Sequence, residues 1–251
     1  MSRGPSRLRV VGIGPGGADQ LTVEAAQALR EVEVFLVPDK GVADLVALRT
    51  ELLARHAPGA RLVQVPDPPR DRDPADYEQA VEDWHDARAA AWEQAMLDTG
   101  ADVVGMLVWG DPSLYDSTLR IVERVLARGR LAFDHDVVPG VTAIALLAAR
   151  HRTVLHRVGE PVLVTTGRRL AESVATGATC LVVMLDGDLA LRDLGPGWDV
   201  WWGANLGTSD ERLVAGTLPD VVPEIEAARA AARSARGWVM DTYLLHRHPP
   251  R

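Results

Sequence analysis

The feature that most constrains the fold of this sequence is a repeated alternation of short aliphatic runs with stretches of helical spacing. Residues 8–13 and 103–108 are mostly aliphatic, and each is followed by a turn and then by apolar residues at the spacing of an α-helix. Parallel strands need crossover connections of this kind, whereas antiparallel strands can be joined by short turns. The alternation therefore predicts an α/β protein with mainly parallel sheets.

The alternation also predicts how the chain is divided. Helices are expected over residues 22–31, 43–56 and 76–98, with Thr22 as an N-cap and with Trp84 and Trp92 in the core. Residues 150–160 are rich in basic side chains and lack apolar periodicity, and the alternation resumes after them. We therefore expect one domain over residues 1–150 and a second over residues 151–251.

Composition excludes several classes of protein. The formal net charge of −8 argues against an extended nucleic-acid surface, and no apolar run approaches the roughly 20 residues that span a bilayer. No apolar signal segment follows the first residues, so a cytoplasmic protein is expected. Cys180 is the single cysteine and lies in an aliphatic run, which predicts a buried, inert thiol and no metal site.

Residues 11–17 form a glycine loop after the first expected strand. Gly12, Gly14 and Gly17 also fit the dinucleotide pattern G-x-G-x-x-G. In that pattern the glycines open directly into a helix, and an acid ends the second strand about 20 residues later. Here the helix begins only near Thr22, and Glu33 has the right spacing but lies at the start of its strand. Dinucleotide binding is therefore the weaker interpretation.

Two further turns join a strand to a helix in the same half of the chain. The first contains Gly110, Asp111 and Pro112, and the second contains Gly140 and Thr142. Ligands of open α/β sheets bind where the carboxyl ends of the strands meet their loops. Each turn alone is an ordinary connection, but three of them predict a common ligand site.

In this order and spacing, the three turns resemble those of the tetrapyrrole (precorrin) methylases. The resemblance extends along nearly the whole chain and is closest to one branch of the family. That branch methylates C-1 of precorrin-5 and releases the C-1 acetyl group as acetate. The segments that carry this closer resemblance are residues 37–41, 66–72, 81–85, 108–120, 159–162, 165–170 and 237–245.

The resemblance implies a two-domain class III methyltransferase fold, with a cofactor cleft between the domains, and a homodimer. S-adenosylmethionine is the implied cofactor and S-adenosylhomocysteine its product. The implied cofactor-binding residues lie in the glycine turns and after two later strands. They are Pro15, Gly110, Asp111, Leu114, Thr142, Ala143, Met184, Ala204 and Leu206.

The implied substrate is a tetrapyrrole with several carboxylates, so cations are expected to bind it. Arg168 and Arg169 are the main candidates, with Lys40 as a third and Arg70, Arg72, Arg152 and Arg157 as looser ones. Removal of the acetyl group calls for a base and for an oxyanion stabiliser. The candidate catalytic residues are Asp111, Tyr115, His151 and Glu160.

Three alternative functions remain open, and the candidate base gives one prediction. The alternatives are another precorrin C-methyltransferase of the family, a dinucleotide-dependent oxidoreductase and a tetrapyrrole carrier without catalysis. Asp111 is the first candidate for the base. If it is the base, the substitution Asp111→Asn should retain cofactor binding and abolish turnover.

Overall fold

The computed structural model describes residues 4–39, 43–69 and 76–249. The chain forms two compact units, one comprising Met1–Gly14 and Ala18–Val141, the other Pro15–Gly17 and Thr142–Arg251. The division expected after residue 150 thus falls within helix α5 (Ala143–His151), which belongs to the second unit. Leu147 of α5 lies against Gly203 of that unit, a contact that periodicity along the chain does not reveal.

The first unit is built on a five-stranded sheet in which every strand pair is parallel. The strand order is β3-β2-β4-β1-β5. Each strand is connected to the next by a helix or a longer segment, as a parallel sheet requires. The strands are β1 (Arg7–Gly12), β2 (Val34–Asp39), β3 (Arg61–Pro66), β4 (Val103–Val108) and β5 (Asp134–Val138).

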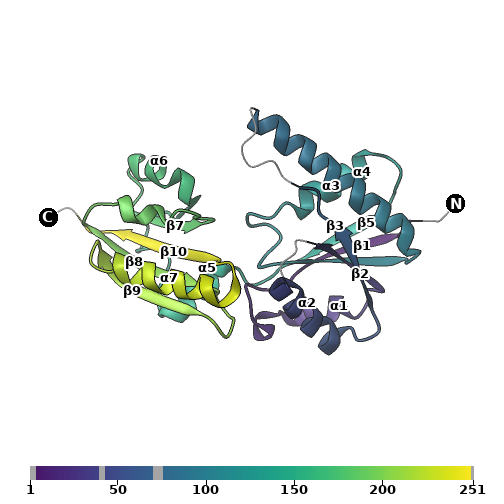
Figure 1. Ribbon diagram of the computed structural model, residues 1–251, viewed down its shortest axis with the longest axis horizontal. Coiled ribbons are helices and arrows are strands. Elements are labelled where there is room, and N and C mark those ends of the chain that lie inside the picture. Colours follow the sequence, from purple (N-terminus) through teal and green to yellow (C-terminus); the bar gives the residue numbers. More distant parts are fainter. Residues whose placement is uncertain (1–3, 40–42, 70–75, 250–251) are drawn as a thin grey trace. The chain divides into compact units, whose positions relative to one another are not determined.

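Helices cover both faces of this sheet (Figure 1). Alternate residues of each strand point to opposite faces, so each face has its own buried cluster. Val10 packs in one buried cluster with Trp92 and Met96, whereas Val11 packs in another with Leu29. The first cluster lies under α3 (Tyr77–Thr99) and α4 (Thr118–Ala127). The second lies under α1 (Val23–Leu29) and α2 (Ala43–His56). Trp92 is 4% exposed, which confirms its expected place in the core.

One helix start agrees with the local signals of the sequence, and another does not. The side chain of Thr22 accepts a hydrogen bond from the Ala25 N–H, which confirms the N-cap. The apolar spacing of the sequence also predicts a helix over residues 114–128, but α4 begins at Thr118, where the Asp116 carboxylate accepts the Thr118 N–H at 2.6 Å. Residues 109–117 are therefore a longer loop than expected.

Trp84 is half-buried and does not belong to the core cluster that contains Trp92. Its ring N–H donates to the Pro68 carbonyl at 2.9 Å, and the Arg88 guanidinium lies 4.6 Å from its ring centre. The expectation of a core tryptophan was wrong here, because the indole joins α3 to the segment after β3.

The second unit contains a sheet of order β6-β7-β10-β8-β9, with β6 parallel to β7 and the other three pairings antiparallel. The expectation of mainly parallel sheets is therefore wrong for this unit. Residues 205–211 between β8 and β9 are too few for a crossover, so these strands pair as a hairpin. The strands are β6 (Leu163–Thr166), β7 (Cys180–Met184), β8 (Trp198–Ala204), β9 (Arg212–Leu218) and β10 (Asp241–Arg247).

Helices α5 and α7 pack against this second sheet, and the short helix α6 follows β6. Ile225 and Ala232 of α7 (Val222–Arg236) pack with Trp202 and Tyr243 in one buried cluster. The short helix α6 (Leu170–Ala175) follows the turn η2 (Gly167–Arg169). A further short turn, η3 (Ala190–Asp193), follows β7.

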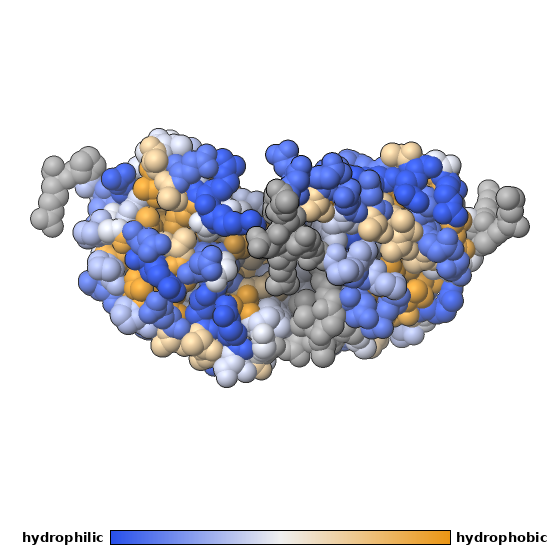
Figure 2. Space-filling view, turned by 45° about the horizontal axis from the view of Figure 1, so that its top comes forward, coloured by the Kyte–Doolittle hydropathy of each residue, from blue (hydrophilic) through white to orange (hydrophobic). Residues whose placement is uncertain are grey.

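Hydrophilic side chains cover much of both units on the face seen in Figure 2, with apolar patches between them. Among the described residues, no helix combines the length and apolar character needed to cross a membrane.

Candidate functional site

The three glycine turns of the first unit are in direct contact with one another. They follow β1, β4 and β5, which are neighbours in the sheet and end at the same edge. Gly14 and Gly110 exchange backbone hydrogen bonds of 3.2 and 2.8 Å. A Cβ atom on Gly140 would lie 2.0 Å from the Gly110 carbonyl oxygen, and one on Gly12 would lie 2.6 Å from the Gly140 nitrogen. Only glycine allows these backbones to approach so closely.

This edge does not have the geometry of a dinucleotide site. The glycines are followed by the short 3-10 turn η1 (Ala18–Gln20), and α1 begins only at Val23, so no α-helix opens directly from the loop. Glu33 lies before β2 rather than at its carboxyl end, and its carboxylate accepts the Val103 N–H at 3.2 Å. Gly14 and Gly110 have φ angles of 79° and 72°, which serve the contact between the turns.

The Asp111 carboxylate joins the second turn to the third. One oxygen accepts the Gly140 N–H at 2.9 Å, and the other accepts the backbone N–H of Ser113 at 2.8 Å as well as the Ser113 hydroxyl. Partial burial raises the pKa of this carboxyl, but the hydrogen bonds from Ser113 and Gly140 lower it by more, so it lies below its ordinary value. This geometry favours a role in holding the loops together.

The remaining candidates of the first unit lie beside these turns. Leu114 is half-buried, and its N–H donates to the Asp111 carbonyl at 3.2 Å. Tyr115 follows with a φ angle of 51° and a side chain that is 44% exposed. Tyr115 is therefore an exposed residue of the loop that follows β4.

The third turn leads into α5, whose first residues were also expected to bind the cofactor. Thr142 is the N-cap of this helix, and its hydroxyl oxygen accepts the Ala145 N–H at 3.1 Å. Thr142 and Ala143 are both half-buried. The capping contact occupies the Thr142 hydroxyl as an acceptor and leaves its hydrogen for another partner.

The end of the first glycine loop packs with Leu206 in the second unit. Pro15 is buried, and a Cβ atom on Gly16 would lie 2.4 Å from the Leu206 carbonyl oxygen. Ala204, at the end of β8, has no exposed surface, and Leu206 is 4% exposed. Three of the expected cofactor-binding residues therefore lie close together in sequence or space, and all three are buried.

Strand register places several other candidates at one edge of the second sheet. Met184 pairs with Thr166 on β6 and with Thr242 on β10, while Asp241 pairs with Ala204. The carboxyl ends of β6, β7 and β8 therefore meet at this edge. We call it the β7 edge; it consists of Thr166, Met184, Ala204 and Asp241 together with the loops that follow β6, β7 and β8.

The arginine pair begins at the β7 edge, directly after β6. Both side chains are exposed, but Arg169 forms an ion pair of 2.8 Å with Glu172, three residues later in the chain. Among the described residues, no ion pair involves Arg168. The pair is thus unequal, and Arg168 is the better candidate for binding a carboxylate of a ligand.

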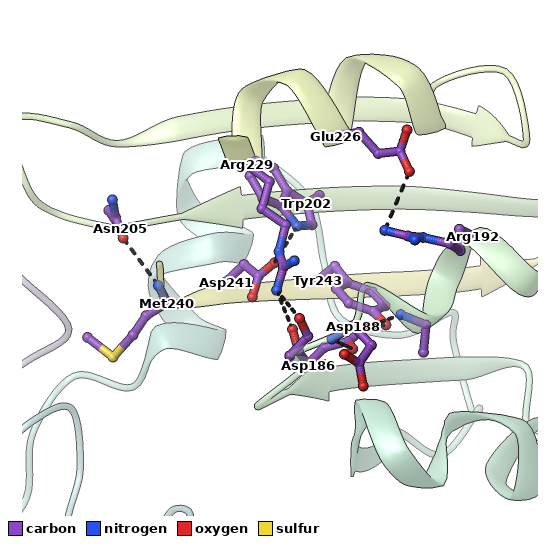
Figure 3. Close-up of polar contacts among 12 residues, drawn as sticks. Asp186, Asp188, Arg192, Trp202, Asn205, Glu226, Arg229, Met240, Asp241 and Tyr243 are labelled. Carbon is purple, nitrogen blue, oxygen red and sulfur yellow. Dashed lines mark hydrogen bonds and ion pairs between the residues drawn. The ribbon is translucent and has the colours of Figure 1, made fainter. Parts of the chain in front are cut away.

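A buried polar network lies behind the β7 edge (Figure 3). The Arg229 guanidinium donates to the Asp241 carboxylate at 2.8 Å and to the carbonyls of Asp186 and Gly187 at 2.7 and 2.9 Å. The Tyr243 hydroxyl donates to the Asp186 carboxylate at 2.6 Å. Burial raises the pKa of Asp241 although Arg229 lowers it, and burial beside Asp186 also raises the pKa of Tyr243.

Sequence reasoning gave none of these four residues a role. Asp241 and Tyr243 lie in the stretch 237–245, which was noted only for its resemblance to the family. Asp186 follows a buried strand closely, much as Asp111 follows β4. That position was the signal that could have identified it.

Glu160 is not placed with the other candidates of the second unit. Its carboxylate accepts the Thr179 hydroxyl at 2.9 Å and the Cys180 thiol at 3.1 Å, at the amino end of β7. Met184 lies at the other end of that strand. The hydrogen bonds from Cys180 and Thr179 hold the pKa of Glu160 below its ordinary value, which makes it a weaker base. We therefore do not retain it as a catalytic candidate.

Cys180 is buried, as expected from the sequence, and burial raises the pKa of its thiol. His151 lies at the end of α5, and its Nε2 atom is 3.0 Å from the Trp202 carbonyl. Because a carbonyl only accepts, Nε2 carries the proton in this contact, and Nδ1 of a neutral ring is left as an acceptor. His151 thus keeps the chemistry of a base.

Lys40, Arg70 and Arg72 lie outside the described residues. Of the looser candidates, Arg157 lies 3.9 Å from the Glu160 carboxylate, and Arg152 is exposed at the end of α5. Within the part of the chain that the structure describes, no group of three histidine, cysteine, aspartate or glutamate side chains is arranged to hold a metal ion.

Comparison with known proteins gives consistent matches. Residues 7–222 match the model of the family Tetrapyrrole (Corrin/Porphyrin) Methylases. The chain is 43% identical to a precorrin-6A synthase (deacetylating) of Sinorhizobium sp., over 97% of this chain and 96% of that protein. Its structure is similar to that of a cobalamin synthesis related protein (CobF) from Corynebacterium diphtheriae. The TM-score is 0.85 and the identity 37%, and the match covers 97% of this chain and 99% of the other.

A second group of relatives is less similar. A precorrin-4 C(11)-methyltransferase of Mycobacterium tuberculosis is 32% identical over 63% of this chain and 53% of its own length. The chain is therefore more similar to the deacetylating enzyme than to this C(11)-methyltransferase, both in identity and in the share of the chain that matches.

Proposed function

Because the chain belongs to the tetrapyrrole methylase family, we propose that it methylates C-1 of precorrin-5 and releases the C-1 acetyl group as acetate, giving precorrin-6A in cobalamin biosynthesis. The observation that carries this reaction is the 43% identity to a deacetylating precorrin-6A synthase over almost the full length of both chains. We also propose a homodimer, which the family resemblance implies, and a location in the cytoplasm.

We propose that the three glycine turns bind S-adenosylmethionine through their backbones. The turns fit this role because Gly12, Gly110 and Gly140 present backbone atoms that no Cβ covers. Bound there, S-adenosylmethionine would supply an electrophilic methyl group, so the protein needs no nucleophile of its own. The main task of the turns is positioning, with Asp111 and Leu114 in the second turn and Thr142 and Ala143 in the third. Pro15, Met184, Ala204 and Leu206 are proposed as cofactor contacts of the second unit.

Release of the acetyl group sets a second demand. Water adds to the acetyl carbonyl carbon and loses a proton to a base, after which the bond from that carbon to C-1 breaks. The electron pair of that bond passes to the macrocycle, and the acetyl carbons leave as acetate. Among the residues given a catalytic role, His151 has a second ring nitrogen that makes no hydrogen bond within the described part of the chain, and Tyr115 is an exposed residue with a hydroxyl group. We propose His151 as the base and Tyr115 as the donor to the oxyanion.

The test of this function is product analysis. The purified protein is incubated with precorrin-5 and methyl-labelled S-adenosylmethionine, and the product is examined by mass spectrometry. Gain of one labelled methyl group with loss of the acetyl carbons is the expected result. Methylation with retention of the acetyl group would indicate a different ring position and another branch of the family, and absence of turnover would favour a carrier.

The unequal arginine pair gives a prediction about substrate binding. Arg168→Ala is expected to raise the KM for the tetrapyrrole about tenfold, the loss of one charge-assisted hydrogen bond of roughly 1.5 kcal/mol. Arg169→Ala serves as the matched variant and should change KM about twofold or less, because Arg169 already pairs with Glu172. Steady-state kinetics of both variants check this. Equal effects would contradict the assignment of Arg168.

The proposed homodimer has its own test. Several exposed aliphatic residues lie in and shortly before the edge strand β6: Leu163 and Val164 are 38% and 36% exposed, and Val154 and Val158, earlier in the chain, are 67% and 102% exposed. Apolar surface of this kind on an edge strand favours association. Light scattering during size-exclusion chromatography should give about twice the chain mass of 27.1 kDa. Val158→Asp should shift the protein towards the monomer if this surface forms the contact.

A further inference from the structure

The buried network behind the β7 edge joins loops that follow different strands. Asp241 begins β10, next to Met240, and Asp186 and Gly187 lie in the loop after Met184. Arg229 on α7 contacts both segments with one guanidinium (Figure 3). Its side chain is 12% exposed and that of Asp241 is 4% exposed, so the ion pair is shielded from water.

Asp186 extends the network to the loop after β6. Its carboxylate accepts the Tyr243 hydroxyl at 2.6 Å and the Ala190 N–H at 2.7 Å. A Cβ atom on Gly167 would lie 2.3 Å from one Asp186 oxygen, so the turn that carries the arginine pair rests directly on this carboxylate.

The loop after β8 is tied to the same point. Asn205 has a φ angle of 49°, and its N–H donates to the Met240 carbonyl at 2.8 Å. Its side-chain oxygen accepts the Met240 N–H at 3.3 Å. Met240 directly precedes Asp241, which also accepts the Trp202 ring N–H at 3.2 Å. The loops after β6, β7 and β8 are therefore linked by contacts to Asp186, Arg229 and the segment Met240–Asp241.

A purely stabilising ion pair would not need this arrangement. Arg229 also donates to two backbone carbonyls of a loop, and a guanidinium fork fixes such a loop in direction as well as in distance. By contrast, Arg192 and Glu226 form an ion pair of 3.5 Å between η3 and the same helix α7, with both side chains nearly half exposed. That pair joins α7 to η3, and among the described residues neither of its side chains donates a hydrogen bond to the backbone of the loop after β7.

We propose that Arg229 is a positioning residue for cofactor binding, acting through Asp241 and through the carbonyls of Asp186 and Gly187. This inference rests on the proposed function, since it assumes that Met184 and Leu206 contact the cofactor. Arg229 itself is half-buried and contacts the loop that follows Met184 and the residue Asp241 that follows Met240. Substitution of Arg229 is therefore expected to lower the affinity for the cofactor more than the rate of the chemical step.

The experiment compares three variants of the full chain by calorimetric titration with S-adenosylhomocysteine. Arg229→Gln is expected to raise the Kd about tenfold, because the fork to both segments is lost. Arg229→Lys should raise it about threefold, because one ammonium can bind Asp241 or the carbonyls but not both in the same geometry. Arg192→Gln, the matched control on the exposed pair, should leave the Kd unchanged.

Kinetics and unfolding separate positioning from general stability. For Arg229→Gln, the KM for S-adenosylmethionine should rise with the Kd, while kcat at saturation changes about twofold or less. If the Kd and KM equal those of the wild type while only the unfolding temperature falls, Arg229 is a structural residue and the inference is wrong. If the wild type itself does not bind S-adenosylhomocysteine, the proposed function fails instead.

A second variant covers the case in which Arg229→Gln does not fold. Tyr243→Phe removes the hydroxyl that donates to Asp186 and leaves the size of the side chain unchanged. It should raise the Kd for S-adenosylhomocysteine about threefold, because Asp186 holds the same loop. An unchanged Kd for both Tyr243→Phe and Arg229→Lys would overturn the inference.

Discussion

Gly140→Ala is expected to weaken binding of S-adenosylhomocysteine about 100-fold, equivalent to about 2.7 kcal/mol. A Cβ atom at this position would lie 2.0 Å from the Gly110 carbonyl oxygen and 2.9 Å from the Gly12 carbonyl carbon. Both neighbours are backbone, so no flexible side chain can move aside, and the third turn has to shift away from the other two. Isothermal titration measures the loss of affinity.

The matched control is Gly59→Ala. Gly59 lies in the same unit, and a Cβ atom there would meet no atom within 4 Å. This variant should bind S-adenosylhomocysteine like the wild type. Circular dichroism and thermal unfolding check that Gly140→Ala retains its fold. A folded Gly140→Ala protein with wild-type affinity would show that the turns do not bind the cofactor.

Asp111→Asn is expected to lower kcat/KM about 100-fold and also to weaken binding of S-adenosylhomocysteine about tenfold. The sequence alone predicted that this variant would keep cofactor binding and lose only turnover. The structure changes that expectation, because both carboxylate oxygens accept N–H groups, from Gly140 and from Ser113. An amide offers one oxygen and one NH₂ group, so one of these N–H groups loses its acceptor at a cost of about 1–3 kcal/mol.

Titration and kinetics on the same preparation test this prediction. Ser113→Ala is the matched control, since it removes a hydroxyl from Asp111 but leaves the contact with Gly140. It should change the Kd for S-adenosylhomocysteine about threefold or less. If Asp111→Asn binds S-adenosylhomocysteine like the wild type and only turnover is lost, the prediction made from the sequence is correct and Asp111 takes part in the chemical step.

The same contacts set a pH dependence. The pKa of Asp111 lies below its ordinary value of 3.8 in the folded protein. A carboxyl with a lowered pKa contributes stability above its ordinary pKa and loses that contribution as the pH falls through the folded value. The link between the second and third turns is therefore intact at neutral pH. Cofactor binding should not change through this group between about pH 6 and pH 8.

Much of the first unit could be predicted from the sequence, because the relevant signals are local. The aliphatic runs at β1 and β4 are strands, and the Thr22 side chain caps α1. The glycines after these strands marked the turns correctly. Such signals depend on residues only a few positions apart, which a single sequence displays.

The sequence could not show which strands become neighbours. The hairpin of β8 and β9 and the central place of β10 make the second sheet mixed, although its apolar runs resemble those of a parallel sheet. Buried strands are apolar on both faces in either arrangement, so composition does not distinguish them.

The sequence by itself therefore determined the α/β character of this protein, its glycine turns and, through its resemblance, its family. Only the tertiary structure decided what the candidate residues do. It showed that Asp111 in the second turn binds the third turn, that Glu160 lies at the amino end of β7, and that Arg229 binds Asp241 and the loop after β7. These contacts link residues that are distant in the chain, and their hydrogen bonds and pKa values arise only when folding buries them together.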